Sequence, residues 1–369
     1  MSNSSLPLPK LNAAGQSVWY DHIHRGMITT GGLAGLIEAD DLRGITSNPA
    51  IFDKAITSTH EYDGILQQAL QQNPGASSRE LFFALAIEDI RDSADILRPV
   101  YDATDGVDGM ISLEVSPDLA QDSTATVREA HELHARLNRP NVMIKVPATE
   151  ACLPAIEQLI ADGMNINVTL LFALDRYKAV AEAYLRGLER RAAQGQSLQR
   201  IESVASFFVS RVDSALDPLV ADKRPDLQGK LAIANAKLAY QAFKKIFNSE
   251  RFQALQAKGA RPQRLLWAST STKNPDYPEL LYVESLIGPQ TVNTMPPATY
   301  EAFREAGVVA PTLDTNSTEA EAQIAALADL GINLKAVTDR LEQEGVAAFA
   351  KAFDNLLAHI AHKAKSLTA

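Results

Sequence analysis

Cysteine is almost missing from this sequence of 369 residues, because Cys152 is the only one. A single cysteine excludes an internal disulfide and a cysteine-based metal cluster, and it is typical of a reducing compartment. Cys152 itself is interpreted as a small residue of a helix. A run of about 18 apolar residues is also missing, and the first sixteen residues lack the charged start and the apolar segment of a secretory signal. We therefore expect a cytoplasmic protein that does not enter a membrane.

Positive charge is scarce as well, since the net charge is −10 and the pI is about 5.3. Binding along a nucleic acid needs a basic face, so no nucleic-acid partner is expected. Neither a glycine-rich dinucleotide fingerprint nor a phosphate-binding P-loop follows a strand-like segment. His22 and His24 have a weak H-x-H spacing without a further ligand, so we expect no metal and no organic cofactor. Small anionic substrates stay possible if a few cations gather locally.

What the sequence does have is a regular alternation of strand-like and helix-like segments. The helix-like segments repeat apolar residues every three or four positions, as at 78–97, 123–138 and 171–194. The strand-like segments number eight: 16–21, 43–48, 109–115, 141–146, 165–170, 202–209, 264–269 and 290–295. Such alternation predicts parallel pairing through right-handed crossovers. Eight repeats favour an α/β fold of the closed (β/α)8 TIM-barrel type over an open sheet.

After the last strand-like segment the pattern is only helical. Apolar residues recur at helical spacing from Leu334 to Lys365, which predicts a long C-terminal helix, 334–365, packed on the barrel. Phe349 and Phe353 lie in this apolar pattern and are interpreted as core residues rather than as ligand contacts. No stretch rich in proline, glycine or serine divides the chain, so residues 1–369 are predicted to form one domain. The pattern gives no indication of the oligomeric state.

Side chains of a strand alternate between its two faces, so every second residue of a barrel strand points into the lumen. In the segment 141–146 this rule turns Lys145 inward, although lysine is rarely buried unless it is paired. In the segment 165–170 it turns the asparagines and Thr169 inward and Leu170 outward.

Further residues share the inward faces or end the strands. They gather near the C-terminal ends of the strands, where barrel enzymes carry their active sites. One polar residue at the barrel mouth would mean little, but their convergence around Lys145 predicts a functional site. The residues are Asp21, Thr46, Asn48, Ser112, Glu114, Asn167, Thr169, Ser206, Phe208 and Ser269.

A lysine inside the lumen indicates a particular chemistry. Removing an ammonium group from water favours the neutral amine, which is a nucleophile for ketones and aldehydes and forms a Schiff base with them. A protonated Schiff base withdraws electrons from the neighbouring C–C bond, as metal-free aldol cleavage requires. Glu114 and Asp21 are candidates for moving the protons, and Thr169 could hold a bridging water. The alternative is a structural ion pair of Lys145 with Glu114, but desolvation makes buried pairs poor stabilisers.

Two cations follow neighbouring strands and could bind an anionic substrate. Arg211 comes directly after the sixth strand-like segment, and Lys273 comes after the seventh among serine and threonine residues. An arginine fork and a lysine beside hydroxyl donors suit a phosphate group. Each cation alone would more often be a solvated surface residue.

Several of these residues lie in segments that resemble the signatures of the transaldolase family. The resemblance covers almost the whole chain and implies a class I aldolase-type barrel. Such an enzyme moves a dihydroxyacetone unit from a ketose phosphate, sedoheptulose 7-phosphate or fructose 6-phosphate, to an aldose phosphate in the pentose phosphate pathway. The matching segments include GITSNPAIF (44–52), MIKVPATEACLPAIEQLIADGMNINVTLLFALDRY (143–177), SFFVSRVD (206–213) and, for the longer bacterial branch, 267–297.

The resemblance also implies roles for single residues. Lys145 matches the Schiff-base lysine, Glu114 the carboxyl that works with a catalytic water, and Thr169 the threonine that helps to hold this water. Asp21 falls at the aspartate that handles the substrate hydroxyl proton during C–C cleavage.

The same resemblance implies residues that bind the substrate. Asn48 matches the asparagine that contacts the dihydroxyacetone hydroxyls. Ser206, Phe208 and Arg211 match the lining and phosphate-binding set, and Lys273 stands where shorter members of the family have an arginine.

Two other functions stay open. One is an aldolase of the same superfamily that releases free dihydroxyacetone to water. The other is a barrel that binds sugar phosphates without turnover, although binding alone needs no imine-forming amine.

Overall fold

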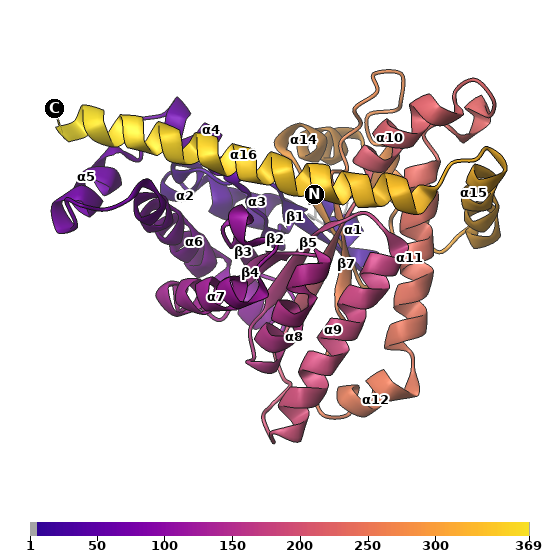
Figure 1. Ribbon diagram of the computed structural model, residues 1–369, viewed down its shortest axis with the longest axis horizontal. Helices are drawn as coiled ribbons and strands as arrows, with labels where there is room; N and C mark the ends of the chain where they lie inside the picture. The colour runs from indigo at the N-terminus through magenta and orange to yellow at the C-terminus, as the bar shows by residue number, and fades with distance from the viewer. Residues whose placement is uncertain (1–5, 369) are drawn as a thin grey trace.

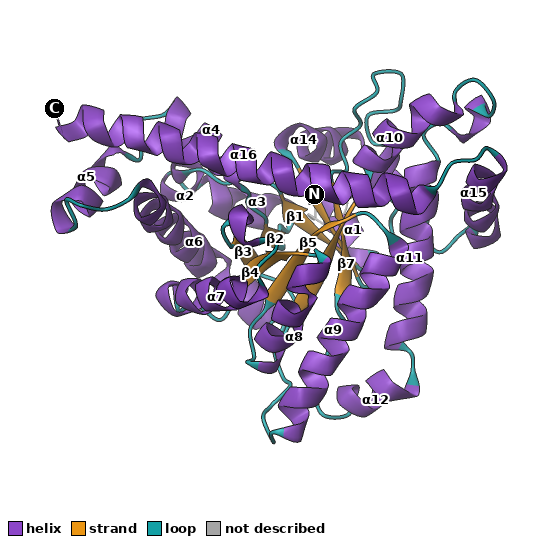
Figure 2. Ribbon diagram, viewed as in Figure 1, coloured by secondary structure: helices purple, strands orange, loops and turns teal. Residues whose placement is uncertain are grey.

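The computed structural model describes residues 6–368, and within this range eight parallel strands close into a barrel. Each strand pairs with the next along the chain, and the last pairs with the first. Figures 1 and 2 show the strands enclosed by helices. The predicted (β/α)8 barrel is confirmed, and each predicted strand segment overlaps one observed strand. The strands are β1 (Gln16–Tyr20), β2 (Gly44–Ile45), β3 (Met110–Glu114), β4 (Val142–Pro147), β5 (Ile166–Leu171), β6 (Ser203–Phe208), β7 (Arg264–Ala268) and β8 (Thr291–Met295).

Helices follow every strand, and several of them begin with sequence signals for a helix start. Asn48 caps α4 by accepting a hydrogen bond from the backbone of Ile51, and Ser77 with Glu80 forms a capping box at α6. The helices are α1 (Pro7–Ala13), α2 (Arg25–Thr29), α3 (Gly32–Asp40), α4 (Pro49–Ser58), α5 (Asp63–Gln72), α6 (Ser78–Ala103), α7 (Ser123–Leu137), α8 (Leu153–Ala161), α9 (Leu174–Ala193), α10 (Ser210–Val220), α11 (Leu231–Phe247), α12 (Glu250–Gln256), α13 (Leu281–Glu284), α14 (Pro297–Ala306), α15 (Ser317–Asp329) and α16 (Leu334–Thr368). Short 3-10 turns lie at Pro117–Leu119, Glu150–Cys152 and Pro225–Leu227.

The C-terminal helix α16 crosses the molecule as one long element (Figure 1). It packs on α4, α5, α6 and α10 and also reaches β5. Phe353, Leu356 and Ile360 on its inner face are buried, as the helical spacing of the apolar residues predicted. The predicted long C-terminal helix is confirmed.

Side chains fill the middle of the barrel lumen. Trp19 on β1 is fully buried beside Gly44 on β2, with which it pairs in register. A Cβ atom on Gly44 would lie 2.5 Å from the Trp19 indole ring, so the ring fits only because this position has no side chain. The lumen is therefore a packed core below its C-terminal end.

The alternation of side chains breaks near the end of β5. The register with β6 shifts between Val168 and Leu171, and Leu170 has a φ of 62°. Its side chain meets α16 near Gly345 instead of continuing the alternation. Leu170 still contacts a helix, as expected of an outward residue, but a bulge interrupts the regular alternation at this point.

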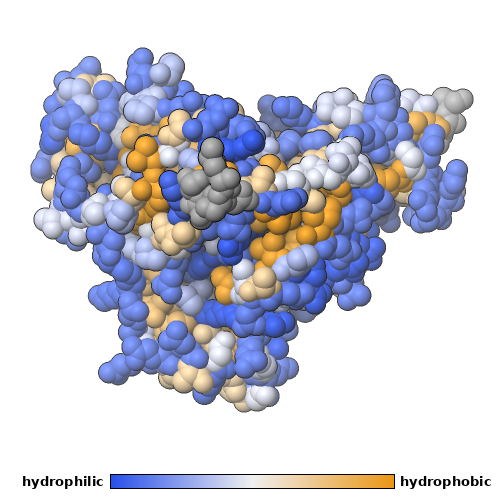
Figure 3. All heavy atoms as spheres, turned by 180° about the vertical axis from the view of Figure 1, so that it is seen from behind, coloured by the Kyte–Doolittle hydropathy of each residue, from blue (hydrophilic) through white to orange (hydrophobic). Residues whose placement is uncertain are grey.

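The outer surface suits a protein whose apolar side chains turn inward. The face opposite to that of Figure 1 is mostly hydrophilic, with smaller apolar areas between (Figure 3). Among the described residues, no helix is both long enough and apolar enough to cross a bilayer.

Candidate active site

A cavity of about 180 Å³ lies at the C-terminal ends of the barrel strands. Ten of the residues predicted for the site line it together, although they come from distant parts of the chain. They are Asp21, Thr46, Asn48, Lys145, Thr169, Ser206, Phe208, Arg211, Ser269 and Lys273. The other three predicted residues, Ser112, Glu114 and Asn167, lie outside the cavity wall. Glu114 and Asn167 contact residues that form the wall, and Ser112 accepts a hydrogen bond from Asn167.

Strand register explains why these residues meet. Lys145 on β4 pairs with Glu114 on β3 and with Asn167 on β5, so all three point to the same side of the sheet. Parallel strands end at the same edge of a barrel, so the last inward-facing residues of the strands surround one cavity.

The amine of Lys145 lies inside the lumen and has few partners. Its Nζ atom is 3.6 Å from Glu114 Oε2 and donates a hydrogen bond of 3.2 Å to the backbone carbonyl of Ser47. The residue is only 5% exposed. The ring of Phe349 covers it, with 5.7 Å between Nζ and the ring centroid.

Glu114 is a carboxyl group that can exchange protons near neutral pH. Burial raises its pKa to about 7, although the positive charge of Lys145 counteracts part of this effect. Its Oε2 atom and the Thr169 hydroxyl are both buried, and neither forms a hydrogen bond with the described part of the protein. Buried polar atoms of this kind normally bind a partner, so these two are available to a water or a substrate.

Asp21 is held by a chain of hydroxyl groups. Thr46 donates a hydrogen bond of 2.6 Å to Asp21 and lies 2.7 Å from the hydroxyl of Thr294 on β8. Burial raises the pKa of Asp21, while Lys145 and the hydrogen bond from Thr46 lower it in part. These hydrogen bonds fix the orientation of the Asp21 carboxyl group, which faces the same cavity as Lys145.

Arg211 and Lys273 place two positive charges on one wall of the cavity. Neither cation forms an ion pair with any residue from 6 to 368. Lys273 donates a hydrogen bond of 2.6 Å to Ser271, and Arg211 lies over the ring of Phe208 at 5.5 Å. Burial lowers the pKa of both groups, and the charge of Arg211 adds to this for Lys273. Two cations without carboxylates form a suitable site for a phosphate group.

Asn167 supports the cavity from outside its wall. It accepts a hydrogen bond of 2.7 Å from Ser206 and donates one of 3.0 Å to Ser112. Ser206 lines the cavity, so Asn167 influences the cavity by orienting the Ser206 hydroxyl.

The sequence interpretation missed some of the lining. Phe353 is core as expected. Phe349 packs against the core too, but the interpretation missed that α16 also places it over the cavity. Thr294 was missed because its strand holds several polar residues, although its inward position follows from the register of β8. Ala268, Ser271 and Pro296 complete the lining.

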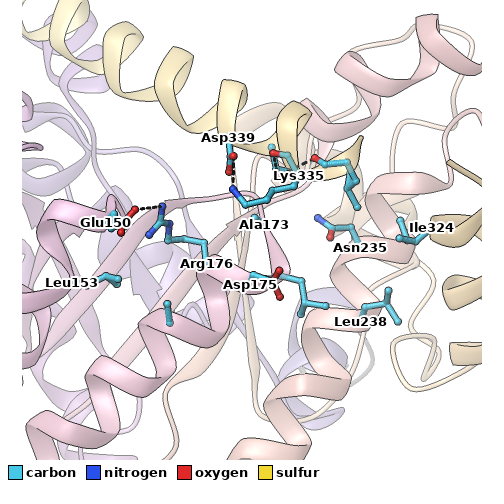
Figure 4. A pocket seen from close by; sticks show the side chains of 14 residues that line it. Glu150, Leu153, Ala173, Asp175, Arg176, Asn235, Leu238, Ile324, Lys335 and Asp339 are labelled. Carbon is cyan, nitrogen blue, oxygen red and sulfur yellow. Dashed lines mark hydrogen bonds and ion pairs between the residues drawn. The ribbon is translucent and has the colours of Figure 1, made fainter. Parts of the chain in front are cut away.

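A larger cavity of about 460 Å³ lies outside the barrel, under the first turns of α16 (Figure 4). Helices α8, α9, α11 and α15 form its other sides. Its rim carries Arg176, which pairs with Glu150 at 4.0 Å, and Lys335, which pairs with Asp339. Both cations of this cavity thus have carboxylate partners, unlike Arg211 and Lys273.

Fold and cavity define the class of protein: a (β/α)8 barrel with a buried lysine at the end where such barrels carry their active sites. A family model described as Transaldolase/Fructose-6-phosphate aldolase matches residues 18–360. The chain therefore belongs to the transaldolase/fructose-6-phosphate aldolase family.

Curated relatives match over nearly the whole chain. Transaldolase of Parafrankia sp. is 49% identical over 358 residues, covering 96% of this chain and 96% of the relative. Transaldolase 2 of Nostoc sp. is 45% identical over 376 residues, covering 98% of both chains. Transaldolase of Thermobifida fusca is 46% identical over 362 residues, covering 97% of this chain and 98% of the relative. The family resemblance inferred from the sequence is confirmed.

Proposed function

We propose that this protein is a transaldolase of the pentose phosphate pathway. It transfers a dihydroxyacetone unit from sedoheptulose 7-phosphate to glyceraldehyde 3-phosphate and gives erythrose 4-phosphate and fructose 6-phosphate. The family and the names of the relatives support this reaction. The observation that carries it is the Lys145 amine, buried 3.6 Å from Glu114 at the cavity.

The proposed cycle begins with a Schiff base. The Nζ atom of Lys145 adds to the donor ketone, and loss of water leaves an iminium ion. Glu114 supplies the proton that the departing hydroxyl needs, because its pKa of about 7 keeps it partly protonated at neutral pH. Glu114 and Thr169 together hold the water that carries this proton.

Cleavage and transfer follow on the same amine. Asp21 takes the proton of the hydroxyl beside the breaking C–C bond, and the bond electrons move into the iminium. The first aldose leaves, and a three-carbon enamine stays on Lys145. The acceptor aldehyde takes these electrons to form the new C–C bond, and Asp21 returns the proton. Water then adds to the iminium and releases the product ketose with the free amine.

Other lining residues hold the substrate in this scheme. Arg211 and Lys273 bind the phosphate group, since they are the unpaired cations of the cavity. Asn48 and Ser206 bind hydroxyl groups of the dihydroxyacetone unit. Thr46 and Ser269 shape the same wall, and the ring of Phe208 packs against the sugar.

Trapping with borohydride tests this function. Reduction in the presence of fructose 6-phosphate should give a stable adduct, and peptide mapping should place it on Lys145. The variant Lys145→Met should give none. The variant Lys237→Met is the matched control, because Lys237 is partly buried but bonds to the Thr315 carbonyl outside the cavity. Absence of an adduct in the native protein, or an adduct on another lysine, would overturn the proposal.

A second candidate is an aldolase that releases free dihydroxyacetone, because the family includes fructose-6-phosphate aldolases. Assays with and without an acceptor aldehyde separate the two reactions. A transaldolase should turn over only slowly without the acceptor, whereas steady release at a comparable rate would favour the aldolase.

The sequence interpretation also predicts a cytoplasmic location, a single domain, no metal or cofactor and no nucleic-acid partner. These stay predictions.

A further inference from the structure

Helix α16 approaches the barrel mouth closely at Gly345. A Cβ atom at this position would lie 3.0 Å from Leu170 Cδ2 and 3.6 Å from the ring of Phe172. Leu170 points toward α16 because of the bulge at the end of β5. The missing side chain of Gly345 therefore lets the helix lie directly on the end of this strand.

One helical turn further on, the same face of α16 carries Phe349. Its ring lines the cavity and lies 5.7 Å from Lys145 Nζ. A turn later Phe353 is 2% exposed and packs against the ring of Phe82 with 5.5 Å between centroids. The two phenylalanines thus have different surroundings, since Phe349 meets the cavity and Phe353 lies in the core.

Contacts on both sides of the barrel mouth hold α16 in this position. Toward its start, Glu342 accepts a hydrogen bond of 3.2 Å from Arg176 on α9. Toward its end, His359 bonds Asp53 on α4 at 2.6 Å, and Lys363 donates to the Ile56 carbonyl at 3.0 Å. Figure 4 shows the first turns of α16 above α9 and α11. The position of Phe349 is thus set by the packing of a whole helix.

The position of the Phe349 ring over Lys145 bears on what happens to the enamine in the proposed reaction. In productive transfer, the enamine carbon donates its electron pair to an aldehyde carbon. In the competing reaction it takes a proton from water, a second water adds to the iminium carbon, and the C–N bond breaks to give free dihydroxyacetone and the Lys145 amine. Both reactions start from the same intermediate, so protonation of the enamine carbon by water competes with its attack on the acceptor aldehyde.

We propose that Phe349 is a specificity-determining residue that keeps water from protonating the enamine carbon on Lys145 and so favours transfer over release. This inference rests on the proposed function and deepens it. The apolar ring covers the amine without offering a donor or acceptor. The ring reaches the site from α16, which is not one of the helices that connect the barrel strands.

The test is a partition ratio, measured as free dihydroxyacetone released per aldose phosphate product formed at saturating acceptor. The variant F349A should raise this ratio by about tenfold, corresponding to about 1.4 kcal/mol between the two barriers. The variant F349L keeps an apolar cover and should stay within about twofold of the native ratio. The variant G345L should raise the ratio with Phe349 intact, because its side chain pushes α16 away from Leu170.

The matched control is F353A, which removes the same ring from the same helix outside the cavity. It should lower the unfolding free energy and leave the partition ratio unchanged. A ratio unchanged in both F349A and G345L would overturn the inference, as would an equal rise in F353A. Borohydride trapping on each variant separates this result from the function itself, since an adduct on Lys145 with an unchanged ratio rejects only the role of Phe349.

Discussion

Buried charge occurs at both ends of the barrel lumen, but its partners differ. At the N-terminal end Arg264 donates hydrogen bonds to Ser17 at 2.8 Å, to the Val107 carbonyl at 2.7 Å and to Asp108 at 3.0 Å. Ser17 donates in turn to Asp108 at 2.9 Å. None of these residues lines the two cavities described above.

At the C-terminal end the charges have weaker protein partners. Arg211 and Lys273 have no carboxylate partner among residues 6–368, and Lys145 is 3.6 Å from Glu114. Burying a charge costs free energy unless other groups compensate for it. The comparison teaches that one end of the lumen satisfies its buried charges within the protein, while the other keeps them available for a ligand.

The largest effect on activity should come from Lys145→Met. It removes the nucleophile, so turnover should fall by at least about 1,000-fold. Stability should fall less than it does when Arg264 is removed, because Glu114, whose pKa is raised to about 7, can take up a proton once its cation is gone. Steady-state kinetics and urea unfolding check both statements. A large loss of stability would mean that this end of the lumen is structural after all.

Arg264→Met should lower stability strongly and leave substrate binding unchanged. It leaves Asp108 buried without its main cation, so the free energy of unfolding should fall by about 3 kcal/mol. The KM for fructose 6-phosphate should not change in the folded protein. Urea unfolding and kinetics at low temperature measure the two quantities, and a raised KM with native stability would break the comparison.

Arg211→Met should weaken phosphate binding. A hydrogen bond to a charged group contributes about 1.5 to 3 kcal/mol, so the KM for fructose 6-phosphate should rise by about 10- to 100-fold. The KM for unphosphorylated donors should not rise. Arg224→Met is a control, because Arg224 is half-exposed and paired with Asp226 just beyond the same helix. An equal KM change for both kinds of donor would contradict phosphate binding by Arg211.

The pH dependence of kcat/KM should report Glu114. Its pKa is raised to about 7, so it is protonated below this pH and loses the proton above it. Because imine formation needs a proton donor, kcat/KM should fall above pH 7 with a slope approaching about tenfold per pH unit. The inflection should disappear in Glu114→Gln. Its persistence at the same pH would assign it to another group.

Tyr277→Phe should have the smallest effect. The Tyr277 hydroxyl donates a hydrogen bond of 2.6 Å to Asp217 on α10, which ties the loop with Lys273 to the helix with Arg211. Losing about 1 kcal/mol here should raise the KM for phosphorylated donors by about fivefold at constant kcat. Tyr300→Phe removes a similar bond, to Asp40, outside the cavity and should not change the KM. Similar KM values in both variants would show that the loop needs no such tie.

Local pattern was sufficient for much of the fold and for the centre of the site. Period two along 141–146 turned Lys145 inward, and the order of strands and helices predicted the barrel. The bulge at Leu170 was not predictable, because the alternation of polar and apolar residues in the sequence continues through it. Phe349 was assigned to the core because helical spacing identifies an apolar face but not what that face meets.

By itself, the sequence determined the order of the elements, the inward face of each strand and the presence of an amine with a carboxyl beside it. These features depend on neighbouring residues and on periodicity. Only the tertiary structure decided that Thr294 supports the Thr46 and Asp21 pair, that Arg211 and Lys273 share one wall, and that α16 covers Lys145. These contacts join residues far apart in the chain, and barrel closure and helix packing fix their distances.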